Sequence, residues 1–506
     1  MADTFNIVTQ DIFIRILDQF FWQLGLHDSR DSAIEVTPNA LLYTALDWQA
    51  QISYDEMTAS SDQPPANGDA SVKTNNHSKQ SDIWKHAPVL TGTSKFEPRP
   101  DVKNIMITGG AGFIACWVVR HLTLTYPHAY NIVSFDKLDY CAALNNTGVL
   151  GESANFTFYH GDITNPAEVV DCMERYNIDT VLHFAAQSHV DLSFGNSYGF
   201  THTNVYGTHV LLESAKKVGI TRFIHVSTDE VYGEVKEDDD DLLETSILAP
   251  TNPYAASKAA AEMLVQSYQK SFKLPAIIVR SNNVYGPHQY PEKIIPKFTC
   301  LLNRQRPLVL HGDGTPTRRY LYAGDAADAF DTILHKGQIG QIYNVGSQDE
   351  VSNLELCGML LDRMRIPHDT PEQLRKWIKY TRDRPFNDRR YAVDGTKLKK
   401  LGWEQKVSID EGLKITVDWL TQFGESWWGD ISHVLTPFPT VSDGEMVPDD
   451  ARSMRDEPLE SQDIRQGKLP EQHKKDDVNG CRELKQHGEN TSVLHQSNTG
   501  GYHIAA

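Results

Sequence analysis

The chain has 506 residues, of which 40% are apolar and 23% charged, and its formal net charge is −19. The apolar fraction suffices for a sizeable core, whereas the acidic excess argues against a nucleic-acid-binding protein, which needs a basic face. The six cysteines are scattered without zinc-ligand or CxxC spacing, which favours a reduced cytosolic protein. The amino end carries acids and no apolar signal region, and no run approaches the roughly 20 apolar residues of a membrane span, so we expect a soluble cytoplasmic protein.

The first hundred residues predict an appendage and a linker outside the main fold. Residues 11–26 carry aromatic and aliphatic side chains at helical spacing, and residues 40–52 indicate a second helix. We expect a helical appendage over 1–57 that packs on itself or on the main domain. A docking helix for a partner or a membrane is the alternative, although the scarcity of Lys and Arg disfavours the membrane. Residues 58–101 are polar and predict a disordered linker.

An alternation of strands and helices begins at Asn104 and predicts an α/β fold. The expected strands are 105–108, 132–136, 156–160, 181–184, 223–227 and 275–280, and helices are expected near 113–126, 165–176, 200–218 and 254–272. This order predicts a Rossmann-type doubly wound parallel sheet with right-handed crossovers. Within a core over 102–435, the shorter pieces of 282–300 and 340–435 indicate a smaller mixed α/β substrate-binding lobe. Residues 436–506 are polar and predict a disordered tail.

A glycine-rich turn follows the first predicted strand. Gly109-Gly110-Ala111-Gly112-Phe113-Ile114-Ala115 opens the next helix, and glycines there let the backbone approach a pyrophosphate that the helix N-terminus attracts. Asp136 ends the second strand, where an acid accepts hydrogen bonds from ribose hydroxyls and repels a 2′-phosphate, which favours NAD over NADP. The alternative is a tight turn without a ligand.

Two further loops lie at the same predicted edge of the sheet. Asp162, in Gly161-Asp162-Ile163, follows the third strand, where an adenine can be held. Ala185-Ala186-Gln187-Ser188 follows the fourth strand, and its small residues let a dinucleotide lie close. Either loop alone is ordinary, but both stand in register with the glycine turn, so we expect them to contribute to the cofactor site.

The fifth strand ends in the polar stretch Thr228-Asp229-Glu230, which offers a hydroxyl, an acid and a base. Tyr254 and Lys258 lie one turn apart on the following helix, so they share a face. Lys258 and a cationic nicotinamide ring favour the phenolate, and lowering its pKa by about three units represents roughly 4 kcal/mol. The acids alone could form a solvated turn, and the Tyr/Lys pair could arise by chance. For the acidic run 237–241 we expect a solvated loop rather than a metal site.

These motifs resemble those of one family. TGGAGFIA, HFAAQSHVD, STDEVYG, NPYAASK, SNNVYGP, YNVG and RPFNDRRY follow the order found in the nucleoside-diphosphate-glucose 4,6-dehydratases, which are extended short-chain dehydrogenase/reductases. The resemblance covers about 102–430, and DKLDYC, NDRRY and WWGD make the chain most similar to the dehydratase part of plant UDP-rhamnose synthases. Ala115 stands where many members have a third glycine. No second domain resembling the plant epimerase/reductase is evident.

The resemblance implies NAD-dependent conversion of UDP-glucose to UDP-4-keto-6-deoxyglucose, a first step toward a 6-deoxysugar such as rhamnose. Tyr254, with Lys258, would take the proton of the sugar 4-hydroxyl while Thr228 bonds that oxygen. Glu230 would abstract the C5 proton, and Asp229 would protonate the departing 6-hydroxyl. The hydride would pass from C4 to NAD and return to C6.

The resemblance also implies a wider set of binding residues and a homodimer. For the cofactor they are Gly109, Gly112, Phe113, Ile114, Asp136, Lys137, Leu138, Asp162, Ile163, Ala185, Ala186, Ser188, Thr203, Tyr254, Lys258 and Asn283. For the sugar nucleotide they are Ser188, Thr228, Asn282, Lys293, Arg318, Asn344 and Arg384. The helices at 199–218 and after Tyr254 would form a four-helix dimer seam. No metal, nucleic acid or membrane is expected.

Several alternatives remain open at this point. A dTDP-glucose 4,6-dehydratase would carry the same catalytic set. A sibling sugar-nucleotide epimerase or decarboxylase would share the glycine turn, Tyr254 and Lys258 but lack the acid pair at 229 and 230. A non-catalytic NAD-binding scaffold with partner-recruiting ends is the alternative outside enzymes. Since the matched core is complete without the ends, we expect it to fold and to stay active without residues before about 99 and after about 440.

Overall fold

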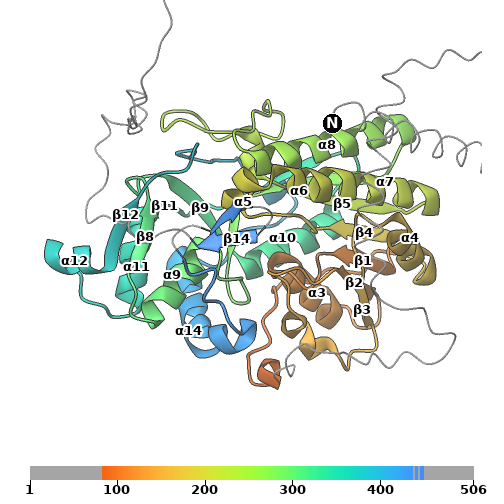
Figure 1. Ribbon diagram of the computed structural model, residues 1–506. Helices are drawn as coiled ribbons and strands as arrows, with labels where there is room; N and C mark the ends of the chain where they lie inside the picture. Colours follow the sequence, from red (N-terminus) through yellow and green to blue (C-terminus); the bar gives the residue numbers. More distant parts are fainter. Residues whose placement is uncertain (1–81, 437–438, 443–444, 449–506) are drawn as a thin grey trace, which may run out of the picture. The chain divides into compact units, whose positions relative to one another are not determined.

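The computed structural model describes residues 82–436, 439–442 and 445–448 (Figure 1). The helices predicted within 1–57, the first part of the predicted linker and most of the predicted tail lie outside the described residues. None of the helices in the described part of the chain is long and apolar enough to cross a membrane. The five cysteines described there are all free thiols.

The described residues are built around a seven-stranded sheet in which every neighbouring pair of strands is parallel. This confirms the Rossmann-type fold. The strands stand side by side in the order β3 (Phe156–His160), β2 (Asn131–Asp136), β1 (Asn104–Thr108), β4 (Thr180–His183), β5 (Arg222–Thr228), β6 (Ala276–Ser281) and β10 (Ile342–Val345).

Two layers of helices cover the sheet (Figure 1). One layer holds α4 (Pro166–Arg175), α7 (Gly207–Val218) and α8 (Pro253–Phe272), and the other holds α3 (Phe113–Thr125) and α10 (Ala323–Lys336). Because both faces of the sheet are covered, β4, β5 and β6 are buried along their whole length, and each carries adjacent rather than alternating apolar residues. This is why the sequence located these strands to within one or two residues.

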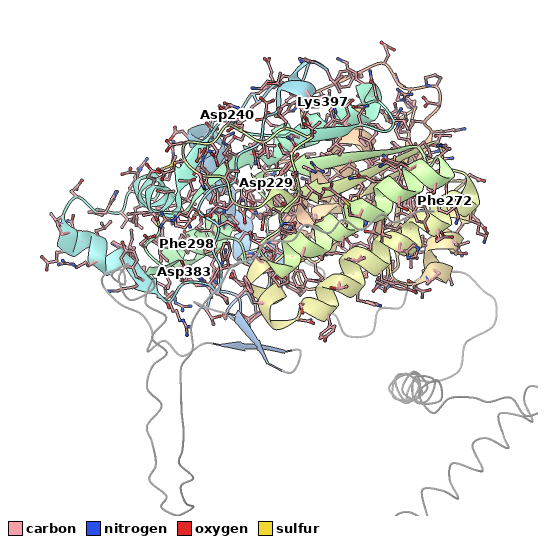
Figure 2. All side chains as sticks on the ribbon, turned by 90° about the horizontal axis from the view of Figure 1, so that it is seen from above. Asp229, Asp240, Phe272, Phe298, Asp383 and Lys397 are labelled. Carbon is pink, nitrogen blue, oxygen red and sulfur yellow. The ribbon has the colours of Figure 1, made fainter. Side chains whose placement is uncertain are left out.

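A smaller lobe lies beside the carboxyl ends of the strands. It contains a three-stranded sheet of β7 (Asn283–Tyr285), β9 (Thr317–Tyr322) and β11 (Glu350–Ser352), a parallel pair of β8 (Leu308–His311) and β12 (Ile378–Thr381), and the helices α9 (Ile294–Asn303), α11 (Asn353–Arg363), α12 (Pro371–Trp377), α13 (Thr396–Lys399) and α14 (Ile409–Trp428). Seen from above, Asp229 lies between this lobe, which carries Phe298 and Asp383, and the far end of α8 at Phe272 (Figure 2).

Short elements make up the remaining connections, and several of them carry site residues. They are η1 (Asp82–Lys85), η2 (Leu144–Asn146), η3 (Gly148–Leu150), α5 (Val190–Gly195), α6 (Ser197–Thr201), the single π-helical turn η4 (His202–Tyr206) and η5 (Asp229–Tyr232). The strands β13 (Pro439–Ser442) and β14 (Glu445–Pro448) pair in antiparallel fashion.

Three predicted boundaries are wrong. Residues 342–345 were assigned to the lobe, but they form β10, which pairs with β6 as the last strand of the main sheet. The linker was predicted to run to residue 101, but residues 82–101 contact the core through Asp328 and Asp331. The tail was predicted to begin at 436, yet β13 and β14, which lie within it, pair in antiparallel fashion. In each case tertiary contacts order a segment whose own composition is polar or ambiguous.

The acidic run 237–241 is exposed except for Asp241, as expected for a solvated loop. Asp241 instead accepts two hydrogen bonds from the Arg319 guanidinium of β9, at 2.5 and 2.8 Å. Among the described residues, no group of three or more His, Cys, Asp and Glu is arranged to hold a metal ion.

Candidate active site

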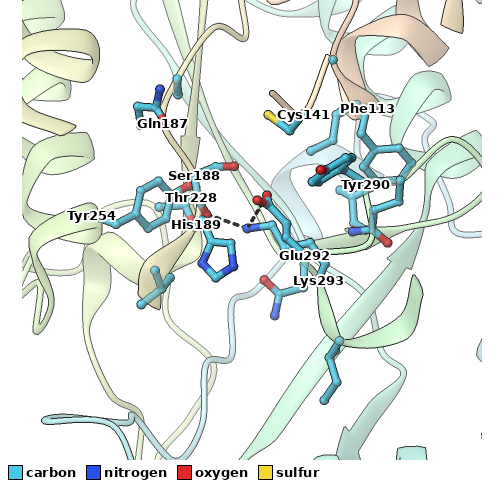
Figure 3. Close-up of a pocket in the computed structure, with 18 of the residues that line it drawn as sticks. Phe113, Cys141, Gln187, Ser188, His189, Thr228, Tyr254, Tyr290, Glu292 and Lys293 are labelled. Atoms are coloured by element: carbon cyan, nitrogen blue, oxygen red, sulfur yellow. Dashed lines mark hydrogen bonds and ion pairs between the residues drawn. The ribbon is translucent and has the colours of Figure 1, made fainter. Parts of the chain in front are cut away.

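One cavity of about 560 Å³ lies where the carboxyl ends of the parallel strands meet the lobe. Both parts contribute to its wall: the glycine turn, Thr228 and Tyr254 come from the sheet and its helices, whereas Lys293 and Arg318 come from the lobe. Figure 3 shows Thr228, Tyr254 and Ser188 on one side and Phe113, Cys141 and Tyr290 on the other. A crevice at this edge of a doubly wound sheet is where such folds bind ligands.

The glycine turn has the geometry that a dinucleotide requires. Gly109 has a φ of +71°, and a Cβ there would stand 2.9 Å from the backbone of Ala185, so only glycine fits. Helix α3 begins after Gly112 without a side-chain cap, which leaves its first N–H groups for an anion. Phe113 and Ile114 at this helix start line the cavity.

Asp136 stands at the end of β2, as predicted, and its side chain is buried. Its carboxylate accepts hydrogen bonds from the backbone N–H of Ala111 at 3.0 Å and of Leu138 at 2.7 Å, which fix its orientation toward the cavity. Burial raises the pKa of this carboxyl, since the two backbone hydrogen bonds offset only part of the desolvation. Lys137 lies 3.3 Å from Asp139 and 3.6 Å from Asp162, and these acids raise its pKa.

Thr228 is the last residue of β5 and caps the short helix η5, which brings Asp229 and Glu230 into a buried position. The Thr228 hydroxyl donates to Asp229 Oδ1 at 3.1 Å and accepts from the Glu230 N–H at 3.3 Å. Thr228 and Glu230 line the cavity. Asp229 does not; its Oδ2 accepts a hydrogen bond from Asn282 Nδ2 at 2.6 Å.

The two acids differ in their surroundings. Burial, with the charge of Glu230, raises the pKa of Asp229 to about 7, although hydrogen bonds from Asn282 and Thr228 oppose this. Burial also raises the pKa of Glu230, opposed first by the hydrogen bond from Asn252 Nδ2 at 3.1 Å. Asp229 can therefore hold a proton near neutral pH, the property of a general acid.

Tyr254 and Lys258 stand in the first turns of α8, whose N-cap Asn252 accepts from the Ala255 N–H at 2.8 Å. Lys258 is buried and donates to the carbonyl of Val226 at 2.6 Å; burial lowers its pKa to about 8. Burial and the charge of Glu230 raise the pKa of Tyr254. The sequence predicted that Lys258 lowers the pKa of this phenol, but the protein groups around Tyr254 raise it.

The lobe adds cationic side chains to the cavity, which Lys137 and Lys258 also line from the sheet domain. Lys293 donates to the Ser188 carbonyl at 2.6 Å and lies 3.8 Å from Glu292 (Figure 3). The Arg384 guanidinium pairs with Asp191, Nε to Oδ1 at 2.6 Å, and this arginine holds the pKa of Asp191 well below its usual value against the effect of burial. Arg318 lies over the Tyr391 ring at 4.7 Å. Cations at this position suit a diphosphate.

Most of the predicted residues meet at this cavity. Lining it are Gly109, Gly112, Phe113, Ile114, Asp136, Lys137, Asp162, Ile163, Ala185, Ala186, Ser188, Thr203, Thr228, Glu230, Tyr254, Lys258, Asn282, Asn283, Lys293, Arg318 and Arg384. Leu138 does not line it and contributes its backbone N–H to Asp136.

The prediction that Asn344 binds substrate is wrong. Its side chain is fully buried in β10, where its amide nitrogen donates to the carbonyls of Leu242 and Asp394, and its oxygen accepts from the Tyr232 hydroxyl. The YNVG motif is conspicuous in sequence, but β10 joins the main sheet and turns this asparagine away from the cavity.

Sequence reasoning missed several cavity residues. Glu292, Lys297, Arg306, Asn252 and Tyr391 also line the wall. Burial lowers the pKa of Lys297 to about 8. The Asn252-Pro253 pair is a recognisable helix start and could have pointed to Asn252, whereas Lys297 and Arg306 stand on segments whose fold against the sheet no local pattern predicts.

A family model described as GDP-mannose 4,6 dehydratase matches residues 106–416, more than half of the chain. The chain belongs to this family of nucleotide-sugar 4,6-dehydratases. The resemblance inferred from the motifs is thereby confirmed.

Two curated relatives illustrate the range of the family. A trifunctional UDP-glucose 4,6-dehydratase/epimerase/reductase of Arabidopsis thaliana is 52% identical over 341 residues, which cover 67% of this chain and 50% of the relative. The dTDP-D-glucose 4,6-dehydratase of Homo sapiens is 47% identical over 337 residues, covering 67% of this chain and 95% of the relative. The chain thus spans about half the length of the plant relatives it matches.

Solved structures show the same fold. A dTDP-glucose 4,6-dehydratase of Streptomyces venezuelae, crystallised with NAD, is 36% identical with a TM-score of 0.61 and covers 64% of this chain and 99% of its own. A UDP-glucose 4-epimerase of Thermotoga maritima is 30% identical with a TM-score of 0.57, covering 64% of this chain and 100% of its own.

Proposed function

We propose that this protein is an NAD-dependent 4,6-dehydratase that converts UDP-glucose to UDP-4-keto-6-deoxyglucose. The observation that carries the proposal is one cavity wall holding the glycine turn, Asp136, Thr228, Glu230 and Tyr254, with Asp229 hydrogen-bonded to Thr228. The uncapped start of α3 suits the pyrophosphate of NAD, and the buried carboxylate of Asp136 suits its ribose hydroxyls.

When bound, NAD supplies the acceptor for a hydride from C4 and the donor of a hydride to C6, so the overall reaction has no net redox change. The phenol oxygen of Tyr254 takes the proton of the sugar 4-hydroxyl, and the Thr228 hydroxyl orients that oxygen. The 4-keto group acidifies C5–H, and the carboxylate of Glu230 removes this proton.

Asp229 protonates the 6-hydroxyl so that it leaves as water, which completes the elimination across C5 and C6. The raised pKa of Asp229, about 7, keeps a fraction of this group protonated near neutral pH. Its carboxyl lies 3.1 Å from Oγ1 of Thr228, which lines the cavity, so the acid stands directly behind the cavity wall.

The acid pair separates this proposal from a sibling epimerase. An epimerase has no use for a buried acid and base beside C5 and C6, whereas elimination needs both. Incubation of the purified protein with UDP-glucose, followed by detection of a 4-keto-6-deoxy product by mass and by carbonyl trapping, tests the proposal. Formation of UDP-galactose instead of a dehydrated product would contradict it.

The choice of UDP over dTDP rests on the higher identity to the plant UDP-glucose relative, 52% against 47% for the human dTDP-glucose relative. The two nucleotides differ by a 2′-hydroxyl and a base methyl, and a methyl alone is worth roughly 1–3 kcal/mol of discrimination. We expect kcat/KM for UDP-glucose to exceed that for dTDP-glucose. A tenfold preference for dTDP-glucose, about 1.4 kcal/mol in the transition state, would reverse the substrate while leaving the mechanism in place. A 6-deoxysugar such as rhamnose is the proposed end of the pathway.

We further propose a homodimer whose seam is formed by α6, η4, α7 and α8, which contact one another. Large apolar side chains are exposed on it: Tyr198 at 90%, Tyr206 at 45% and Met263 at 49%. Exposed apolar side chains on helices that contact one another suit an interface with a second copy of the chain. Light scattering of wild type and Met263→Glu tests this, since the charge should yield monomers. A wild type that is monomeric at micromolar concentration would contradict the proposal.

A further inference from the structure

Residues 82–101, here called the strap, are fixed to the core at several places along their length. Midway along the strap, the N–H groups of Thr93 and Ser94 donate to Asp328 Oδ1 at 2.6 and 2.8 Å. Near its amino end, the ring of Trp84 lies so close to Gly148 that a Cβ at position 148 would stand 2.8 Å from it. Trp84 also belongs to an apolar cluster with Trp419 and Trp427 of α14. The strap therefore covers tryptophans of the substrate lobe while being tied to the sheet domain.

Arg120 of α3 connects the strap to a segment that lines the cavity. Its side chain is buried, and no ion pair with a carboxylate is found for it among the described residues. Its guanidinium instead donates from Nε to the Leu90 carbonyl of the strap at 2.9 Å and from Nη1 to the Asn146 carbonyl at 2.5 Å, and its Nη2 lies 3.3 Å from His288 Nδ1. A buried cation needs all of these acceptors, so strap, η2 and His288 are held by one side chain.

His288 has a backbone conformation that residues other than glycine seldom adopt. Its φ is +72°, in the left-handed region, which costs free energy that the surroundings must offset. Its ring lies 4.7 Å from the Trp419 ring and 4.9 Å from the Trp427 ring, measured between centroids. Trp117 Nε1 donates to the carbonyl of the preceding Pro287 at 3.0 Å. The fold thus imposes this conformation from several sides.

The residues directly after His288 enter the cavity. Gln289, Tyr290, Glu292 and Lys293 all line its wall. Lys293 reaches the Ser188 carbonyl at 2.6 Å, and Glu292 accepts from the Tyr140 hydroxyl at 2.6 Å. A change of direction at His288 would displace all of these groups together, and misplacement by about 1 Å can cost up to ~100-fold in rate.

We propose that His288 is a positioning residue whose left-handed backbone, held by Arg120 and the tryptophans beneath the strap, directs segment 289–293 into the cavity. The strap is then part of the catalytic unit, although it precedes the first strand and contributes no cavity residue. The role of Lys293 in holding a sugar nucleotide rests on the proposed function. The position of segment 289–293 in the cavity wall is independent of the proposed function.

The test compares two full-length variants that differ in backbone preference. Asparagine adopts the left-handed region readily, and its side-chain oxygen can accept from Arg120; valine is β-branched and does neither. We expect His288→Val to speed hydrogen exchange at the amides of residues 289, 290, 292 and 293 and to raise the KM for UDP-glucose and the Kd for UDP, each about tenfold, with NAD content per chain unchanged. His288→Asn should stay within about twofold of wild type in each measurement.

A second pair of variants, at Trp84, tests the role of the strap in the same assays. Trp84→Ala should change exchange at 289–293 and the Kd for UDP in the same direction as His288→Val, and Trp84→Phe should restore wild-type values. This pair decides the question if His288→Val does not fold. Equal behaviour of the valine and asparagine variants, or faster exchange spread over the whole sheet, would overturn the proposal. If wild type turns over no sugar nucleotide, the proposed function fails, while the exchange comparison still decides the role of His288.

Discussion

Replacing Glu230 by glutamine separates the two halves of the proposed reaction. Glutamine has the same shape and keeps an oxygen to accept the hydrogen bond from Asn252, now at 3.1 Å, so the fold of η5 should persist. The carboxylate that would remove the C5 proton is lost. A positioned general base contributes about 10²–10⁴-fold, which corresponds to roughly 3–5 kcal/mol of barrier at about 1.4 kcal/mol per tenfold.

The same substitution removes a negative charge beside two other groups. The charge of Glu230 helps to raise the pKa of Asp229 and the pKa of Tyr254. Without it, both pKa values fall: Asp229 is protonated less often at neutral pH, which slows elimination further, whereas the Tyr254 phenol ionises more easily. Oxidation at C4 should therefore survive in Glu230→Gln while elimination does not.

The assay is a single turnover with UDP-glucose, followed by the absorbance of reduced nicotinamide and by product mass. Glu230→Gln should accumulate reduced cofactor and release little or no 4-keto-6-deoxy product. Glu237→Gln, in the exposed acidic loop, is the matched control and should behave as wild type. Unchanged product formation would remove Glu230 from the mechanism, and loss of both signals would place it in the oxidation step instead.

Three other changes have expected outcomes. Asp229→Asn should abolish dehydration but stabilise the fold at pH 8. The pKa of Asp229 is raised from 3.8 to about 7 in the folded state, so the native state binds an extra proton between these values and wild-type stability falls as the pH rises through this window. In thermal or urea unfolding, the variant should therefore be more stable than wild type by up to about 4 kcal/mol at pH 8 and by little at pH 4. Deleting residues 1–81 should leave the free energy of unfolding and the NAD content unchanged. Deleting residues 1–101 should lower the free energy of unfolding by several kcal/mol, because the buried carboxylates of Asp328 and Asp331 lose hydrogen-bond donors worth about 1–3 kcal/mol each. Equal stability of the two truncated proteins would show that the strap is dispensable. Asp191→Asn removes the charge that pairs with Arg384 at 2.6 Å and should raise KM for the sugar nucleotide with kcat nearly kept; a change in kcat alone would exclude a binding role for this pair.

The strands, the glycine turn and the chemistry at the end of the fifth strand can be predicted from the amino-acid sequence alone. Buried parallel strands are short apolar runs, so β1 to β6 were visible, and the turn residues Gly109 and Asp136 follow from what a dinucleotide needs at fixed offsets from a strand. Thr228, Asp229 and Glu230 are consecutive, and Tyr254 and Lys258 are one helical turn apart, so local geometry already brings each set together.

Features that depend on contacts between distant segments became visible only in the folded chain. Asn344 looks like a site residue in sequence, but the parallel pairing of β10 with β6 buries it in a different network. The polar strap is ordered because Asp328 and Asp331, more than 230 residues later, accept its hydrogen bonds. The raised pKa of Asp229 and the backbone of His288 likewise arise from burial and from neighbours that no local pattern encodes.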